Sequence, residues 1–303
     1  MQFVTFAAAG EELPGLILDD ETLLDLRHAF ARGQGQAPSS LHALIAAGPD
    51  MAKACGDLAA ATRTGSLKNA CVKRSHVRLL APIPRPPKNV FCVGRNYADH
   101  VAEGARAQNK DIPLPQHPQF FTKPPTAIVG PDADVPHHKE ITEKLDYEVE
   151  LALIIGTSGK NIPKDKAYEH IFGYTILNDI TARDLQRRHD QWFKGKGLDG
   201  SCPIGPWIVH KSALANPQNL DISLTVNGET RQHANTSMMI FDIPTIVATL
   251  SAGLTLEAGD IIATGTPSGV GYAMDPPVFL KDGDVVECRI EGIGTLRNRI
   301  KAI

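Results

Sequence analysis

Three carboxylates stand at alternate positions near the middle of the chain, in the run Asp146-Tyr147-Glu148-Val149-Glu150. The apolar and β-branched residues that follow, up to Gly156, predict a strand. Alternate side chains of a strand share a face, so we expect the three carboxylates on one side, roughly 7 Å apart, and Val149, Leu151 and Leu153 on the other. Carboxylates placed this way repel each other and resist desolvation. A hard cation such as Mg²⁺, Mn²⁺ or Ca²⁺ would resolve both problems. A solvated strand face or ordinary ion pairs are the alternatives.

A further carboxylate, Asp179, stands where a strand over 172–177 is expected to give way to a helix over 182–193. That position is suited to directing a ligand at a site. Arg183 and Gln186 follow at i and i+3 spacing, so they share one helix face and point the same way as Asp179. The alternative is that Asp179 or Thr181 merely caps the helix.

A histidine and a glutamate at helical spacing form a candidate general base. His100 and Glu103 lie at i and i+3, so the carboxylate can orient the imidazole on one helical turn. A surface contact is the alternative for such a pair. The polar stretch 103–117 is unsuited to a core and is interpreted as a lid over a site.

Other segments carry groups suited to a charged ligand. Lys123 shares a strand face with Phe121, and a glycine-rich loop over 192–203 holds two lysines. The segment 263–271 follows a strand and offers backbone N–H groups and a hydroxyl to an anion, without the lysine of a nucleotide-binding P-loop. His137-His138 is interpreted as loop, because adjacent residues point apart.

The elements that must position these groups are short and β-rich. Four prolines at positions 82–87 favour an extended connector, which places a boundary between a small N-terminal α+β domain, residues 1–78, and a catalytic domain, residues 79–303. The first domain is expected to contain strands over 1–6 and 15–18 and helices over 22–31 and 41–47. In the second we expect a helix over 243–251 and strands over 89–93, 119–123, 147–155, 172–177, 207–210, 222–226, 260–264 and 285–290. Strands and helices do not alternate, which argues against a doubly wound fold. The predicted class is α+β and β-rich, with a rolled or barrel-like sheet and peripheral helices.

The bulk composition is that of an ordinary globular protein. The 303 residues carry a net charge of −3, which gives no reason to expect nucleic acid or a membrane surface as a partner. No apolar run approaches a membrane span. Five scattered cysteines without C-x-x-C spacing favour reduced thiols in a cytoplasmic protein.

Taken together, the chain from about Arg78 onward resembles the fumarylacetoacetate hydrolase superfamily. The resemblance rests on five ordered motifs: Gly94-Arg95-Asn96-Tyr97, Asp146-Tyr147-Glu148-Val149-Glu150-Leu151, Asn178-Asp179-Ile180-Thr181-Ala182-Arg183-Asp184, Lys196-Gly197-Leu198-Asp199 and Gly259-Asp260-Ile261-Ile262-Ala263-Thr264-Gly265-Thr266-Pro267. It implies a mixed β-roll catalytic domain, a homodimer, and Mg²⁺ or Mn²⁺ held by Glu148, Glu150 and Asp179.

The same resemblance implies roles for the other residues. Lys196 would stabilise charge near the metal, and His100 with Glu103 would activate water. Contacts to the substrate's carboxylate or carbonyl groups are implied for Arg95, Tyr97, Lys123, Arg183, Gln186 and Thr266. Larger hydrolases of the family have a threonine four residues after the lysine, where this chain has Gly200, with Ser201 next.

The leading prediction for the reaction is hydrolysis of a C–C bond in an acylpyruvate-type 2,4-dioxo acid, such as fumarylpyruvate from aromatic catabolism. The small-molecule substrate would bind through a 2-oxo carboxylate, and the released pyruvate would form as a metal-bound enolate. The alternative is an isomerase or decarboxylase of a 2-oxo or 2-hydroxymuconate-type diacid, or of oxaloacetate, on the same site. A catalytically silent sugar- or acid-binding module is the alternative from another class.

Overall fold

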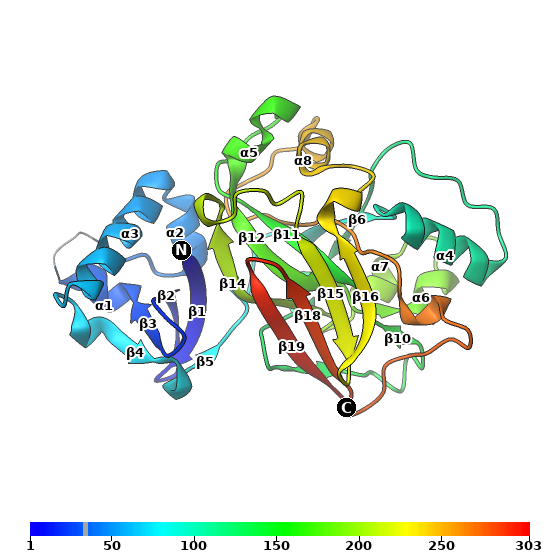
Figure 1. The fold of residues 1–303 in the computed structure, drawn as a ribbon, viewed down its shortest axis with the longest axis horizontal. Coiled ribbons are helices and arrows are strands. Elements are labelled where there is room, and N and C mark those ends of the chain that lie inside the picture. The colour runs from blue at the N-terminus through cyan, green and yellow to red at the C-terminus, as the bar shows by residue number, and fades with distance from the viewer. Residues whose placement is uncertain (33–35) are drawn as a thin grey trace.

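A twelve-stranded sheet joins the N-terminal part to the rest of the computed structural model, which describes residues 1–32 and 36–303 (Figure 1). Its main strand order is β4-β3-β2-β1-β14-β12-β11-β17-β6-β7, with β5 added beside β1 and β8 beside β14. All its pairings are antiparallel except β17 with β6 and β14 with β8. The strands are β1 Gln2–Ala8, β2 Glu11–Ile17, β3 Thr22–Asp25, β4 Cys71–Lys73, β5 Arg78–Leu79, β6 Val90–Gly94, β7 Gln119–Lys123, β8 Ile128–Val129, β11 Val149–Ile155, β12 Ile171–Asn178, β14 Cys202–His210 and β17 Ile261–Ala263.

A second sheet covers one face of the first, as Figure 1 shows with β15, β16, β18 and β19 in front of β11, β12 and β14. It has the order β16-β15-β18-β19-β9, and β10 and β13 form a separate two-stranded sheet. The main core lies where the two larger sheets meet, with Leu151 and Leu153 of β11 in one cluster with Leu224 and Ile290. The strands are β9 Asp134–Pro136, β10 Leu145–Asp146, β13 Thr181–Ala182, β15 Asp221–Val226, β16 Glu229–Asn235, β18 Val285–Ile290 and β19 Gly294–Lys301. The predicted β-rich α+β class is confirmed.

The helices lie on the outside of the sheets (Figure 1). Those labelled α1 to α3 cover the N-terminal strands, and α4, α6 and α7 gather at the opposite end of the molecule. The α-helices are α1 Leu26–Ala31, α2 Leu41–Ala46, α3 Pro49–Arg63, α4 Ala98–Gln108, α5 Ala167–His170, α6 Arg183–Arg188, α7 Phe193–Lys196 and α8 Ile243–Ser251. The 3₁₀ turns are η1 Lys68–Ala70, η2 Arg74–His76, η3 Pro125–Ala127, η4 Lys164–Lys166, η5 Lys211–Ala213, η6 Thr236–Met238 and η7 Gly271–Ala273. No described helix is both long enough and apolar enough to cross a bilayer.

Two predicted helices are divided in the structure. The first four residues of the expected helix over 22–31 form β3, because they pair with β2 and β4, and α1 follows with Asp25 as its N-cap. The expected helix over 182–193 ends early: α6 covers only its first part, and the chain then turns and forms the separate helix α7. There the missing Cβ of Gly195 lets α7 lie directly against the backbone of Gln186.

The carboxylate strand also begins later than expected. β11 starts at Val149, and Asp146 belongs to β10, which pairs with β13. The apolar side chains Val149, Leu151 and Leu153 face the main core, as predicted, while Ala152 and Ile154 face a second core cluster. Glu150 precedes these two on the same face of the strand.

The second core cluster links the N-terminal residues to the rest of the chain. Phe3 and Leu44 pack in the same cluster as Ile154 and Ile208, and β1 pairs with β14 through Phe3↔Ile208. The predicted boundary between residues 78 and 79 falls inside β5, so the division into two domains stays a prediction. All five cysteines are free thiols, as expected.

Candidate active site

Glu148, Glu150 and Asp179 form a buried carboxylate cluster. Val149 of β11 lies opposite Asn178 of β12, so Asp179 just past β12 meets Glu148 just before β11, and the Asp179 N–H donates to the Glu148 carbonyl at 2.8 Å. One carboxylate oxygen from each of the three residues lies within 4.8 Å of the others. Their exposed fractions are 4%, 1% and 0%, so a solvated strand face is excluded. The helix-cap alternative for Asp179 is wrong, since Ala182 is the N-cap of α6.

Asp146, which was expected on the same face, stands apart from this cluster. Its carboxylate accepts from the Arg183 Nε at 2.8 Å and from the backbone N–H groups of Gly271 and Tyr272 at 2.8 and 3.1 Å. Asp146 therefore holds Arg183 and the segment after residue 270 in place.

Three buried cations compensate the three cluster carboxylates and Asp146. Lys196 Nζ lies 2.7 Å from Glu148 and 2.5 Å from Asp179, Lys123 Nζ lies 2.7 Å from Asp179, and Arg183 Nη2 lies 2.7 Å from Glu148. Four negative against three positive groups leave one uncompensated negative charge. Glu150 is the carboxylate that none of these cations pairs with: its Oε2 accepts from the Gly265 N–H at 2.7 Å.

The electrostatics of the cluster fit a divalent cation. Burial, followed by the charges of Asp179 and Glu148, raises the pKa of Glu150 well above its ordinary value. Burial acts on Glu148 in the same direction, but Lys196 and Arg183 overcome it and lower the pKa of that carboxyl. Three converging carboxylates, one of them lacking a cationic partner, supply the oxygen donors that Mg²⁺ or Mn²⁺ prefers. Glu148, Glu150 and Asp179 would hold such an ion.

His100 and Glu103 face this cluster from α4. His100 Nδ1 lies 2.8 Å from Glu103 Oε1, and the two side chains are 11% and 8% exposed. The second Glu103 oxygen accepts from the Gly269 N–H at 2.8 Å. The surface-contact alternative is therefore wrong: Glu103 is fixed from two sides and fixes the imidazole in turn. The free His100 Nε2 is left for chemistry.

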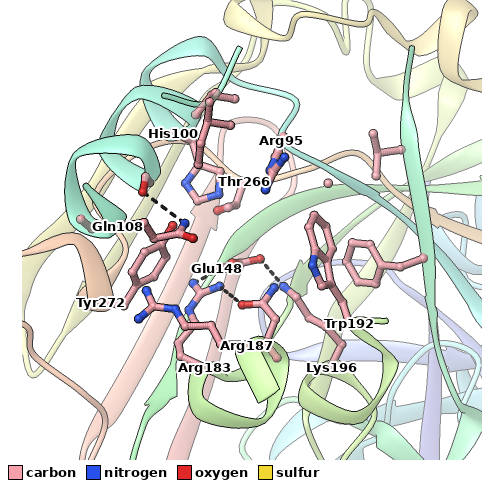
Figure 2. A pocket seen from close by; sticks show the side chains of 18 of the residues that line it. Arg95, His100, Gln108, Glu148, Arg183, Arg187, Trp192, Lys196, Thr266 and Tyr272 are labelled. Atoms are coloured by element: carbon pink, nitrogen blue, oxygen red, sulfur yellow. Dashed lines mark hydrogen bonds and ion pairs between the residues drawn. The ribbon is translucent and has the colours of Figure 1, made fainter. Parts of the chain in front are cut away.

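A cavity of about 610 Å³ lies between α4 and the segment of α6 and α7. In Figure 2 Glu148 lies at its centre, with His100 and Arg95 on one side and Arg183, Arg187 and Lys196 on the other. The lining residues are Val93, Gly94, Arg95, His100, Val101, Gly104, Ala107, Gln108, Lys110, Ile112, Phe121, Glu148, Glu150, Arg183, Gln186, Arg187, His189, Asp190, Trp192, Lys196, Thr266 and Tyr272. Lys110 and Ile112 belong to the polar stretch predicted as a lid, and its closing motion stays a prediction.

Four of the six predicted substrate contacts line this cavity: Arg95, Arg183, Gln186 and Thr266. Arg183 and Gln186 share a helix face as expected, with Arg183 Nη1 donating to Gln186 Oε1 at 3.2 Å. Thr266 accepts at its hydroxyl from the Gln232 amide at 2.8 Å.

The other two do not line the cavity. The assignment of Lys123 as a substrate contact is corrected, and that of Tyr97 stays a prediction. Lys123 is fully buried and donates to Asp179 and to the carbonyls of Ile180 and Lys196, so it orients cluster residues rather than a ligand. Tyr97 is 1% exposed and packs in the main core. The strand alternation that placed Lys123 correctly gave no sign of what its ammonium would meet.

The loop over 263–271 binds anions, but they are the protein's own. The N–H groups of Gly265, Gly269 and Gly271 donate to Glu150, Glu103 and Asp146. The prediction that this loop presents backbone N–H groups to a bound anion is corrected accordingly. Its Gly265 adopts φ of +99°, and a Cβ there would lie 2.7 Å from Asn96. Ser201, next to the position of the family threonine, donates to the Lys196 carbonyl and reaches no carboxylate of the cluster.

Three aromatic and cationic residues of the cavity were not singled out from the sequence as ligand contacts: Arg187, Trp192 and Tyr272. Trp192 packs edge-on against Phe121 and lies under the Arg95 guanidinium, 5.5 Å from the ring centre. Arg187 follows Arg183 at i+4, and this spacing was the available signal for a shared helix face.

A family profile and full-length relatives agree with this geometry. The profile "Fumarylacetoacetate (FAA) hydrolase C-terminal" matches residues 89–301. The chain belongs to the fumarylacetoacetate hydrolase family. One relative, the oxaloacetate tautomerase YisK of Bacillus subtilis (strain 168), is 48% identical over 99% of this chain and 100% of its own.

Two solved members of the fumarylacetoacetate hydrolase family extend the likeness to three dimensions. A fumarylacetoacetate hydrolase from Exiguobacterium antarcticum superposes with a TM-score of 0.82 at 43% identity, covering both chains completely. A probable 2-hydroxyhepta-2,4-diene-1,7-dioate isomerase from Mycobacterium abscessus superposes with a TM-score of 0.78 at 32% identity, over 100% of this chain and 99% of its own. The predicted family fold is confirmed. Family members named as hydrolases, isomerases and a tautomerase share it, so the protein is an enzyme of this family.

Proposed function

We propose that this protein is a divalent-metal-dependent tautomerase that interconverts the keto and enol forms of oxaloacetate. The observation that carries the proposal is the His100–Glu103 pair, which faces the carboxylate cluster across one cavity. Keto–enol exchange requires one base that moves a proton between C3 and the C2 oxygen, together with stabilisation of charge on that oxygen. The full-length similarity to an oxaloacetate tautomerase supports this choice of reaction.

The proposed cofactor is a divalent metal ion, and it would contribute by stabilising charge on the substrate. A divalent ion held by Glu148, Glu150 and Asp179 would act as a Lewis acid that stabilises negative charge developing on the substrate's C2 oxygen.

The chain's own residues supply the proton transfer. Because Nδ1 of His100 donates to Glu103, Nε2 is the unprotonated nitrogen that accepts the proton from C3. The Glu103 carboxylate stabilises the imidazolium that forms, and Nε2 then returns the proton to the C2 oxygen. Lys196, fixed by Glu148 and Asp179, places a further positive charge at the cavity wall.

The test is a direct comparison of products. Enol oxaloacetate is mixed with Mg²⁺- or Mn²⁺-loaded protein, and the decay of its ultraviolet absorbance is followed beside pyruvate and CO₂ formation. We expect enol decay far above the spontaneous rate, with neither pyruvate nor CO₂ formed in step. Enol decay at the spontaneous rate would overturn the proposal, and CO₂ released in step with it would indicate a decarboxylase.

Hydrolysis of an acylpyruvate is the second candidate, favoured by the size of the cavity. A volume of about 610 Å³ is generous for a four-carbon acid, and the same base can activate water. An acylpyruvate incubated in ¹⁸O-water would then release an acid labelled in its carboxylate, with an equal amount of pyruvate. Turnover in either assay would exclude a silent binding module.

A further inference from the structure

We propose that Arg187 anchors the distal carboxylate of the substrate, so that the site selects dianionic over monoanionic acids. The inference rests on the proposed function for the position of the 2-oxo end beside the carboxylate cluster. It adds the subsite for the other end, which sequence motifs did not mark.

The charges that line the cavity favour a dianion. Five lining residues are cationic (Arg95, Lys110, Arg183, Arg187 and Lys196), and three are carboxylates (Glu148, Glu150 and Asp190). Arg183 and Lys196 are paired with buried carboxylates. For Arg95, Lys110 and Arg187, no carboxylate lies within ion-pair distance in the described part of the chain. These three are free to meet a ligand.

Among these three, Arg187 is held in position on the same helix face as Arg183. Its Cζ lies 4.9 Å from the centre of the Tyr272 ring, and the Cζ of Arg183 lies 4.5 Å from the same centre. Figure 2 shows both guanidinium-bearing side chains beside Tyr272, with Glu148 beyond them. The ring fixes the Arg187 guanidinium by cation–π contact. Its N–H donors stay available, and less rotamer entropy is lost when a ligand binds.

Tyr272 is itself fixed by two neighbours. Its backbone N–H donates to Asp146 at 3.1 Å. A Cβ on Gly104 of α4 would lie 2.7 Å from the Tyr272 hydroxyl, so the glycine makes room for the ring. The Tyr272 ring that contacts Arg187 belongs to η7 and is therefore held in place by residues of α4 and β10.

The spacing of the two arginines suits a short diacid. Arg183 reaches the cluster through Glu148, and Arg187 stands one helical turn, about 6 Å, further along the same face. A 2-oxo carboxylate seated at the cluster would extend its second carboxylate toward Arg187. Arg95 lies across the cavity against Trp192 and is left to the first carboxylate or the keto group.

The experiment measures equilibrium binding of two ligands that cannot turn over. Malate and 2-hydroxybutanoate of the same handedness share the hydroxy-acid end and differ in a distal carboxylate against a methyl group. Calorimetry with Mn²⁺-loaded wild-type protein is expected to show tighter binding of malate. Arg187→Gln should weaken malate binding by about 10- to 100-fold, the usual worth of a hydrogen bond to a charged group. Its binding of 2-hydroxybutanoate should change less than about threefold, because the charge pair with the second carboxylate is then absent.

The matched control is Arg188→Gln, which removes an exposed arginine that does not line the cavity. It should leave both affinities unchanged. Three results would overturn the subsite. The wild-type protein could bind the two ligands equally well, or Arg187→Gln could lose the same affinity for both. The third is a malate-specific loss in Arg95→Gln instead of Arg187→Gln. Since neither ligand reacts, a subsite that behaves as expected without enol turnover would reject the tautomerase alone, and turnover without malate selectivity would reject the subsite alone.

Discussion

The three carboxylates of the cluster differ in whether a buried cation pairs with them, and this difference can be tested at single residues. Asp179 is bonded to two buried lysines, whereas Glu150 accepts one backbone hydrogen bond and faces two like charges. Removing the Asp179 charge leaves buried cations uncompensated, at a cost of about 3 kcal/mol. Removing the Glu150 charge relieves repulsion.

We therefore predict opposite effects for Asp179→Asn and Glu150→Gln on the metal-free protein. Asp179→Asn should lower the free energy of unfolding, and Glu150→Gln should leave it unchanged or raise it. Both should abolish Mn²⁺ binding, as should Glu148→Gln. Urea unfolding without metal and calorimetry with Mn²⁺ check the two halves separately. Unchanged Mn²⁺ affinity in any of these variants would remove that residue from the ligand set.

His100 and Glu103 are expected to act as one unit. His100→Ala should lower turnover by about 10²–10⁴, the usual worth of a positioned base, with Mn²⁺ affinity preserved. Glu103→Gln should act on the same step, so the double variant should be little slower than the slower single one. The glutamine of Glu103→Gln still has an oxygen that can accept from the Gly269 N–H. This variant therefore removes the carboxylate charge and keeps the hydrogen bond to the loop. Independent, multiplying losses in single-turnover measurements would contradict the paired base.

Residue spacing predicted the parts of the site that lie within one strand or one helical turn. Glu148 with Glu150, His100 with Glu103, and Arg183 with Gln186 were all visible as local patterns. The role of Lys123 was not, because its ammonium meets Asp179 and two carbonyls from segments about 55 to 75 residues away in the chain. Arg187 and Tyr272 likewise come together only through the packing of α6 against η7.

At the level of elements, the segment from Gly265 to Tyr272 ties together carboxylates from three others. It donates backbone hydrogen bonds to Glu150 of β11, Glu103 of α4 and Asp146 of β10. The sequence predicted that the segment 263–271, which follows a strand, offers backbone N–H groups and a hydroxyl to an anion. Which anions it binds depends on sheet register between distant strands, and no single stretch of sequence contains that information.

The contact between α4 and η7 gives an element-level prediction. Gly104→Ala should displace Tyr272, whose hydroxyl would lie 2.7 Å from the new Cβ, and weaken malate binding through Arg187. Tyr272→Phe removes that hydroxyl, so the double variant Gly104→Ala/Tyr272→Phe should recover most of the affinity. Calorimetry of the two single variants and the double variant checks the coupling. Additive losses would show that the two residues do not act through this contact.

At the scale of the whole molecule, the N-terminal residues share both a sheet and a core with the catalytic part. Phe3 is fully buried, pairs with Ile208 across the sheet and packs 5.1 Å from the Phe172 ring centre. The proline-rich connector predicted a boundary near residue 80, and composition alone gave no sign that β1 would pair with β14. Continuous pairing across a boundary couples the stability of the two sides.

We accordingly predict that the chain unfolds as one cooperative unit. Phe3→Ala should cost about 3–5 kcal/mol, because a buried ring is replaced by a cavity. Trp207 packs against the N-terminal cluster of Val4 and Phe6, whereas Trp192 lines the active-site cavity. The fluorescence is therefore followed in a Trp207→Phe background, where Trp192 reports on the catalytic part alone. Urea transitions followed by this fluorescence and by far-ultraviolet circular dichroism should coincide and shift together in Phe3→Ala. Phe120→Ala, at a half-exposed ring 36% accessible to solvent, should shift neither by a comparable amount. A tryptophan transition left in place by Phe3→Ala would instead show that the catalytic part folds independently of the N-terminal strands.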